Sequence, residues 1–320
     1  MTMRFLKLNN GLRMPALGIG TWRAPDAELE KALDAALEVG YRHIDTAPVY
    51  MNEKAIGRVL KKWIDSSKLK REDLYIVTKL PPMGIRPSSV ETFLRKSLED
   101  LQLSYVDMYL IHTPFGIPEG TNFDKDEKGL MIIDKETDHV ATWKKMEEMV
   151  KLGLTKSIGV SNFNVQQVQR IIDNSTIKPS NLQVELHIYL QQNELVDLCK
   201  KNGIAVTAYA PLGSRGISEL IKSAGINRDL PDLMDNPEVG RIAKKHNKTP
   251  AQVLIRWIIE RGIATIPKST NSERLKQNFQ VFDFSLDKGD MDVLAKLDAG
   301  IRVCDFDFFP GIKNHPEFPW

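Results

Sequence analysis

The sequence predicts a closed barrel of eight parallel strands, each followed by a helix, in a chain of 320 residues. Short apolar runs alternate eight times with longer segments whose apolar residues recur every three or four positions. Nearly continuous apolar strands are typical of parallel sheets covered by helices on both faces. Eight such pairs in about 300 residues fit a (β/α)8 barrel. A doubly wound sheet is the alternative fold, but it needs fewer strands, and the glycines near residue 20 do not form the G-x-G-x-x-G motif that opens a helix.

The elements follow one another in the order that a barrel requires. The first strand is expected within PALGIGTW (15–22). The helix after it is expected at 26–40, where Leu29, Leu33 and Leu37 lie on one face and Gly40 ends it. The other strands are expected at 42–47, 74–80, 106–114, 156–162, 181–187, 204–213 and 263–269. Their helices are expected at 52–67, 88–101, 140–153, 164–174, 193–203, 249–262 and 272–279.

Five segments lie outside the eight pairs. Residues 4–17 place an Asn-Gly turn between two short apolar runs, which predicts a β-hairpin at the bottom of the barrel. Extra helices are expected at 236–247 and 286–300. A long insertion (115–140) follows the fourth strand, and an aromatic tail (303–320) has no helical or strand period. We expect these long loops at the carboxyl-terminal face, where barrels carry their sites. Because no Ser/Gly-rich linker divides the chain, residues 1–320 are expected to form one domain.

Composition argues against several classes of partner. The 44 Lys and Arg residues nearly balance 42 Asp and Glu residues, and both signs are mixed along the chain. A nucleic-acid or membrane-surface partner therefore has no electrostatic support. The polar start does not resemble a signal peptide, and no apolar run approaches the ~18 residues of a spanning helix. A cytoplasmic protein is expected. Cys199 and Cys304 are too few for a disulfide scaffold, and Cys199 is expected in the core.

Four chemically active side chains follow neighbouring strands. Asp45 and, just beyond it, Tyr50 follow the second strand, Lys79 the third and His112 the fourth. The carboxyl ends of barrel strands converge on one mouth, so these side chains are expected together. A cation against a phenol favours the phenolate and lowers its pKa, while a buried aspartate holds the lysine charged. Tyr50 could then protonate a developing alkoxide whose oxygen the imidazole orients. One histidine and one aspartate are too few for a zinc or iron site, so no metal is expected.

These residues carry a family resemblance. GYRHIDTAPVYMNE, LYIVTKL and VDMYLIHTP, with SIGVSNF and IPKS further on, resemble the aldo-keto reductase superfamily over essentially the whole chain, and most closely its aldose and aldehyde reductase-like, carbonyl-reducing branch. The resemblance implies that Asp45, Tyr50, Lys79 and His112 are catalytic. NADPH would deliver a hydride to an aldehyde or ketone, and Tyr50 would protonate the oxygen, as in an alcohol dehydrogenase (NADP+) of the aldehyde reductase type. His112 stands where the branch that reduces steroid carbon–carbon double bonds has glutamate. Most members of this group are monomers, so a monomer is expected.

The resemblance also assigns cofactor residues at the barrel mouth. Near the nicotinamide and its ribose they are Gly20, Thr21, Trp22, Asp45, Ser161, Asn162, Gln183 and Tyr209. Around the pyrophosphate they are Leu212 and Ser214, and around the adenosine 2′-phosphate and adenine they are Lys268, Ser269, Thr270, Arg274, Gln277 and Asn278. A lysine, hydroxyls and an arginine at the head of a helix suit a phosphate better than a bare ribose, which favours NADPH over NADH.

The substrate pocket is expected to be wide. Many aldose and aldehyde reductases have a tryptophan at the positions of Thr113 and Pro81, and each indole would fill about 150–250 Å² of contact surface. The substrate-binding residues are expected to be Trp22, Val49, Tyr50, His112, Thr113 and Cys304. We therefore expect bulky or cyclic carbonyls, steroid-like or lipid-derived, to be accepted beside small aldehydes. Phe306, Phe308 and Phe309 of the tail either supply replacement walls or are packed without a role in the pocket.

Two other functions are compatible with the same fold. Some relatives bind NADPH as regulatory or structural proteins, and sugar-phosphate isomerases use similar barrels. NADPH consumption with carbonyl compounds distinguishes a reductase from a regulatory or structural protein. Turnover of a sugar phosphate without nicotinamide would indicate an isomerase. Among the other histidines, His187 is expected to be structural, His43 to face the helices, and His139 and His246 to lie at the surface.

Overall fold

Eight parallel strands form the barrel in the computed structural model, which describes residues 4–223, 225–226, 228 and 230–320. Each strand pairs with the next along the chain. Parallel bridges from Leu17 to Thr265 and from Gly20 to Lys268 join the first strand to the last, which closes the sheet. The predicted (β/α)8 fold is confirmed. The strands are β3 (Ile19–Gly20), β4 (His43–Asp45), β5 (Tyr75–Leu80), β6 (Met108–Ile111), β7 (Ile158–Ser161), β8 (Asn181–Glu185), β9 (Ala205–Tyr209) and β10 (Ala264–Thr265).

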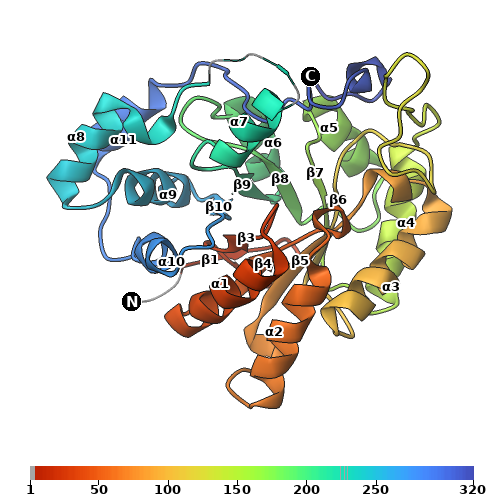
Figure 1. Cartoon of the computed structure of the whole chain (residues 1–320), viewed down its shortest axis with the longest axis horizontal. Helices are drawn as coiled ribbons and strands as arrows, with labels where there is room; N and C mark the ends of the chain where they lie inside the picture. The colour runs from red at the N-terminus through yellow and green to blue at the C-terminus, as the bar shows by residue number, and fades with distance from the viewer. Residues whose placement is uncertain (1–3, 224, 227, 229) are drawn as a thin grey trace.

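Helices surround the sheet in chain order (Figure 1). Those that follow the strands are α1 (Asp26–Val39), α2 (Glu53–Asp65), α3 (Val90–Leu101), α4 (His139–Lys151), α5 (Val165–Asn174), α6 (Asn193–Lys201), α9 (Pro250–Glu260) and α10 (Ser272–Phe279). The two extra helices that the sequence predicts are α8 (Pro237–His246) and α11 (Lys288–Ala295), which lie outside the ring at the left of the figure. A further helix, α7 (Arg215–Ser223), was not expected; it buries Ile217 and Ile221.

Local sequence sets where the helices begin and end. Thr249 caps α9, because its hydroxyl accepts a hydrogen bond from the Gln252 backbone N–H, and Pro250 occupies the first turn, where a missing N–H costs little. Gly40 follows α1 with φ of 120°, a conformation that favours glycine. These caps lie at the positions where the sequence predicted the helices to start and stop.

The bottom of the barrel is closed by a hairpin of β1 (Phe5–Lys7) and β2 (Arg13–Pro15). Leu8 and Met14 are buried with apolar residues of the strands. Asn10 donates a hydrogen bond to the Ser157 hydroxyl, just before β7. The hairpin therefore has the place that the sequence predicts and leaves the opposite face open for a site.

The long loop after β6 and the C-terminal tail lie side by side beyond the carboxyl ends of the strands (Figure 1). The Met131 backbone N–H donates to the Pro310 carbonyl at 2.7 Å, and the rings of Phe123 and Phe309 stack 4.8 Å apart. Two segments that are distant in sequence thus form one cover beside the mouth of the barrel.

Candidate active site

Asp45, Tyr50, Lys79 and His112 converge at the mouth of the barrel. Asp45 ends β4, Lys79 lies near the end of β5, and His112 directly follows β6. Tyr50 lies in a short 3-10 helix, Pro48–Tyr50, that follows β4. The ammonium Nζ of Lys79 lies 2.5 Å from Asp45 Oδ1 and 3.3 Å from the Tyr50 hydroxyl. The structure therefore joins the carboxylate, the ammonium and the phenol in one chain of contacts.

Asp45 and Lys79 form a buried ion pair, with 2% and 0% of their surfaces exposed. The second carboxylate oxygen of Asp45 accepts a hydrogen bond from Gln183 Nε2 at 2.7 Å, and Lys79 also donates to the Thr46 carbonyl at 2.9 Å. Burial opposes the charge of Lys79, but Asp45 and Tyr50 together outweigh it, so the pKa of Lys79 lies above its usual value. The ammonium is therefore charged and fixed in direction.

Tyr50 differs from the sequence-based expectation in its acidity. Burial raises the pKa of Tyr50 to about 12, although the Lys79 ammonium acts in the opposite direction. The expectation that Lys79 brings the phenol below its ordinary pKa was wrong, because the sequence does not show how strongly the surrounding segments desolvate the hydroxyl. At neutral pH the hydroxyl keeps its proton and is able to donate it.

His112 lies edge-on to Tyr50, with ring centroids 5.7 Å apart. Burial, assisted by the charge of Lys79, holds the pKa of His112 well below its usual value, so the ring is neutral at pH 7. Its Nδ1 atom is buried without a hydrogen-bond partner among the described residues. The site thus contains a neutral imidazole beside a protonated phenol.

Residues in or directly after β7, β8 and β9 form a second hydrogen-bonded group next to these four. Asn162, in a left-handed conformation with φ of 63°, donates to the His112 carbonyl at 2.9 Å and accepts from the Tyr209 hydroxyl at 2.7 Å. Ser161 accepts from the same amide at 3.2 Å, and Gln183 holds Asp45. The structure brings together these four predicted cofactor residues.

Gly20, Thr21 and Trp22 lie at the carboxyl end of the first strand, where it meets the last strand and closes the barrel. A side chain at Gly20 would meet the Ile266 carbonyl oxygen at 2.8 Å, so glycine permits the close approach of the first strand to the segment after the last. The buried Thr21 hydroxyl donates to the Asp45 carbonyl at 2.9 Å. Trp22 is half-buried.

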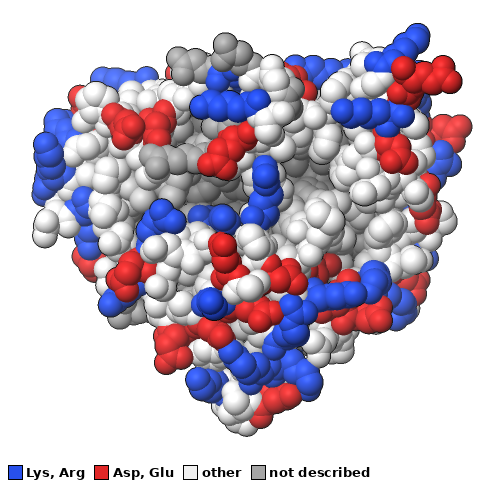
Figure 2. Space-filling view, in the orientation of Figure 1, with Lys and Arg blue, Asp and Glu red and all other residues white. Residues whose placement is uncertain are grey.

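A group of polar residues extends from the segment after β10 along α10. Lys268, Arg274 and Gln277 are exposed, Thr270 is half-buried, and Ser269 and Asn278 are buried. Within the described part of the chain, no carboxylate pairs with Lys268 or Arg274. Figure 2 shows this face hollowed over the barrel, with Lys and Arg side chains bordering the hollow on the side of β10 and α10. Leu212 and Ser214 follow β9, and Ser214 has a φ of 43°.

An apolar cluster covers the mouth beside the polar groups. Cys304 and Phe306 are buried in it, and Trp22 and Tyr209 pack against it. Thr113 is buried, with its hydroxyl bonded to the Phe115 carbonyl at 2.9 Å, and Val49 is half-buried. Of the predicted substrate residues, Trp22 and Cys304 therefore belong to one apolar cluster, to which the tail contributes its aromatic rings.

Two histidine predictions were wrong and one was partly wrong. His139 is 1% exposed and not at the surface, because the tail folds over it. His43 lies on the same side of β4 as Asp45, and its ring centroid is 5.1 Å from that of Tyr75, which packs with the apolar residues inside the barrel. His246 is half-buried against Asp290. His187 is structural as expected; its partner Glu185, fully buried, was not singled out from the sequence.

Residues 4–223, 225–226, 228 and 230–320 contain neither a membrane-spanning helix nor a cluster of metal ligands. No helix there is long and apolar enough to cross a membrane. No group of three or more His, Cys, Asp or Glu side chains there is arranged to hold a metal ion.

Comparison with known proteins agrees with this geometry. The model of the aldo/keto reductase family matches residues 15–299. The chain belongs to the aldo/keto reductase family. Relatives within the aldo/keto reductase family include the aldo-keto reductase family 1 member A1 of Gallus gallus, 42% identical over 99% of this chain and 97% of the relative. Prostaglandin F synthase 1 of Bos taurus is also 42% identical, over 98% and 97%.

A solved structure shares the whole fold. The aldose reductase from Schistosoma japonicum superimposes with a TM-score of 0.90 at 40% identity, covering 99% of each chain. Aldo/keto reductases are oxidoreductases that generally use a nicotinamide cofactor, and carbonyl reduction is the general reaction of the family.

Proposed function

We propose that this aldo/keto reductase reduces aldehydes and ketones to alcohols with NADPH, using Tyr50 as the general acid. The observation that carries the proposal is the contact chain from Asp45 through Lys79 to the Tyr50 hydroxyl, with neutral His112 beside it. A protonated phenol next to a fixed ammonium can release its proton as negative charge develops on a substrate oxygen. The ammonium then stabilises the phenolate that remains.

The residues present fit NADPH. Lys268 and Arg274 are exposed beside the N-terminus of α10 and pair with no carboxylate of the described chain, and the helix dipole adds to their attraction for a phosphate. Asn162 and Gln183 present side-chain amides next to the four reactive groups. When bound, NADPH supplies a hydride to the carbonyl carbon.

This chain's own residues supply the rest of the reaction. Tyr50 gives its proton to the carbonyl oxygen, and Lys79 keeps the resulting phenolate in place. His112, which is neutral, orients the oxygen by a hydrogen bond. Asp45 keeps Lys79 charged and directed. The apolar cluster of the tail and the loop after β6 lies beside the mouth and lowers the local polarity, which strengthens these electrostatic contacts.

We infer a preference for bulky substrates. Thr113 and Pro81 are smaller than the two indoles that many aldose and aldehyde reductases carry at these positions, and an apolar and aromatic cluster lies beside the mouth. We propose hydrophobic, steroid-like or lipid-derived carbonyls as the preferred class. A panel assay of NADPH absorbance would test this with hydrophobic ketones, short aldehydes and aldoses. Faster turnover of the polar aldoses would contradict the substrate class, and no turnover with any carbonyl would contradict the function.

A further inference from the structure

The C-terminal tail is attached to the barrel by a buried carboxylate that lies outside the four reactive residues. Glu185 ends β8, and its side chain is fully buried. One oxygen accepts from the Val303 backbone N–H at 2.6 Å and the other from the Cys304 backbone N–H at 2.8 Å. His187 Nε2 lies 2.9 Å from the first oxygen. Three N–H donors thus converge on one carboxylate.

Burying the Glu185 carboxylate costs free energy, which the hydrogen bonds from the tail must offset. Among the described residues, no lysine or arginine pairs with Glu185, so its buried charge depends on the three N–H groups. A buried charge whose hydrogen-bond donors are lost is strongly unfavourable. Two of the donors are backbone groups, which cannot rotate away while the chain stays in place. Glu185 therefore fixes the backbone of the tail more precisely than apolar packing would.

The fixed segment lies at the pocket. The Cys304 thiol lies near Tyr50 and in the apolar cluster against which Tyr209 packs. Two residues further on, the Phe306 ring packs edge-on against Phe115, with centroids 5.1 Å apart. Movement of the segment would therefore shift a wall that stands beside the proposed acid.

We propose that Glu185 is a positioning residue that holds Val303 and Cys304 as a wall of the carbonyl pocket and so determines how tightly substrates bind. The proposal rests on the proposed reductase function. It concerns residues that touch the tail and not the reacting atoms, so substrate affinity should change more than the chemical step.

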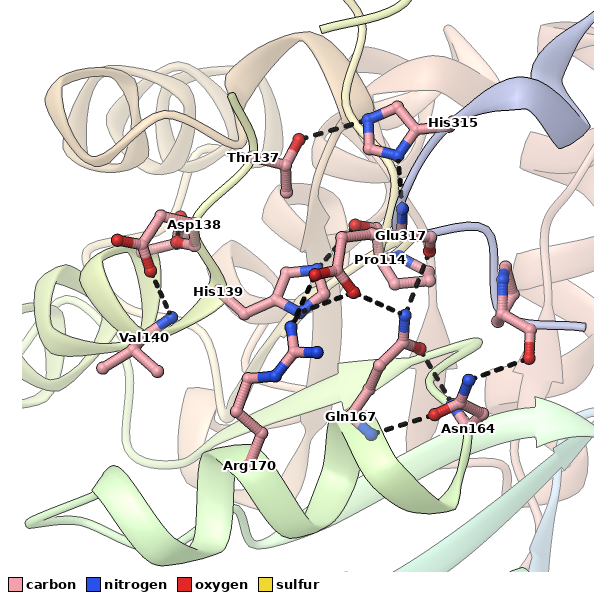
Figure 3. A network of polar contacts seen from close by, with 12 residues as sticks. Pro114, Thr137, Asp138, His139, Val140, Asn164, Gln167, Arg170, His315 and Glu317 are labelled. Atoms are coloured by element: carbon pink, nitrogen blue, oxygen red, sulfur yellow. Dashed lines mark hydrogen bonds and ion pairs between the residues drawn. The ribbon is translucent and has the colours of Figure 1, made fainter. Parts of the chain in front are cut away.

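The far end of the tail has a separate anchor, which provides a matched control (Figure 3). Glu317 accepts hydrogen bonds from Arg170 at 2.6 Å and from Gln167 at 3.0 Å, both on α5. Asn164 donates to the Pro319 carbonyl at 3.0 Å. A Glu317→Gln variant removes a tail carboxylate of the same type at a point away from Cys304.

The test compares Glu185→Gln with Glu317→Gln. Glutamine keeps the shape but places an amide N–H₂ against a backbone N–H. We expect E185Q to raise the KM for a small aldehyde by about tenfold or more. The kcat at saturation and the affinity for NADPH should stay within about twofold, whereas E317Q should leave all three unchanged. A folded E185Q with an unchanged KM would overturn the proposal, because a merely structural role lowers Tm alone.

A second readout does not depend on turnover. Release of the segment should speed alkylation of Cys304 by iodoacetamide at least several-fold in E185Q, while Cys199, buried in α6, stays protected as an internal reference. Equal alkylation rates of Cys304 in the wild-type protein and in E185Q would overturn the proposal that Glu185 fixes this segment. If the wild-type protein turned over no carbonyl, the reductase function would be wrong. The alkylation comparison would still test whether Glu185 fixes the segment. If E185Q does not fold, hydrogen exchange at the Val303 and Cys304 amides of the wild type provides the test. Slow exchange supports the proposal that Glu185 fixes the segment, and exchange as fast as in an unprotected peptide overturns it.

Discussion

Replacing Lys79 by methionine tests the effect of the buried ion pair on stability and its effect on the reaction rate. Methionine has nearly the same length and removes only the ammonium. Asp45 then keeps the hydrogen bond from Gln183 and loses its charge partner. Tyr50 loses the cation 3.3 Å from its hydroxyl. The variant should therefore be both less stable and slower.

The structure sets the size of both losses. Removing one partner of a buried pair costs about 3–5 kcal/mol of the free energy of unfolding, because the other charge stays buried. Loss of a charged hydrogen bond to the proposed acid costs about 1.5–3 kcal/mol, or roughly 10- to 150-fold in kcat. A double variant, Asp45→Asn with Lys79→Met, has no unpaired charge. It should regain much of the stability and none of the rate.

Urea unfolding of the apo proteins measures the first effect, and NADPH oxidation at saturating cofactor measures the second. The reasoning is refuted if Lys79→Met keeps a kcat within about threefold of wild type, since the charged contact would then contribute less than 1 kcal/mol. It is also refuted if the double variant is as unstable as the single one.

Three further predictions follow from the same geometry. The kcat for reduction should be flat from about pH 6 to about pH 10, because Tyr50, with a pKa of about 12, keeps its proton there and His112 stays neutral; a pH–rate profile with a limb near pH 7 would contradict this. Lys268→Met or Arg274→Met should weaken NADPH binding about tenfold or more and leave NADH binding nearly unchanged, because the 2′-phosphate distinguishes the two; fluorescence titrations that show equal losses would exclude the phosphate site. Burial lowers the pKa of His139, so the stability it contributes is present above the unfolded pKa of about 6.5 and is lost as pH falls. His139→Gln should thus make the fall in Tm between about pH 7 and pH 5 shallower, and an unchanged slope would contradict it.

The barrel could be predicted from the sequence because its signals are local. Alternating apolar runs, caps such as Thr249 and the Asn-Gly turn each act within a few residues. The helix α7 was missed because it begins close behind the strand expected at 204–213, although Ile217 and Ile221 have helical spacing. The convergence of Asp45, Lys79 and His112 was predictable once the barrel was, since strand ends of a barrel meet.

What the sequence did not reveal depends on contacts distant along the chain. The burial of His139 requires Glu317 and its neighbours to fold over α4. Glu185 binds backbone N–H groups of the tail, and a backbone donor leaves no signature in the sequence. The raised pKa of Tyr50 follows from burial by several segments together.

The central claim, that Tyr50 donates the proton, is tested most directly by single-turnover NADPH oxidation in a Tyr50→Phe variant. Phenylalanine keeps the ring beside His112 and removes only the hydroxyl. NADPH should bind with unchanged affinity, and the rate of the chemical step should fall by about 10²- to 10⁴-fold, the usual contribution of a positioned general acid. A variant that binds NADPH normally and retains the wild-type rate would contradict the account.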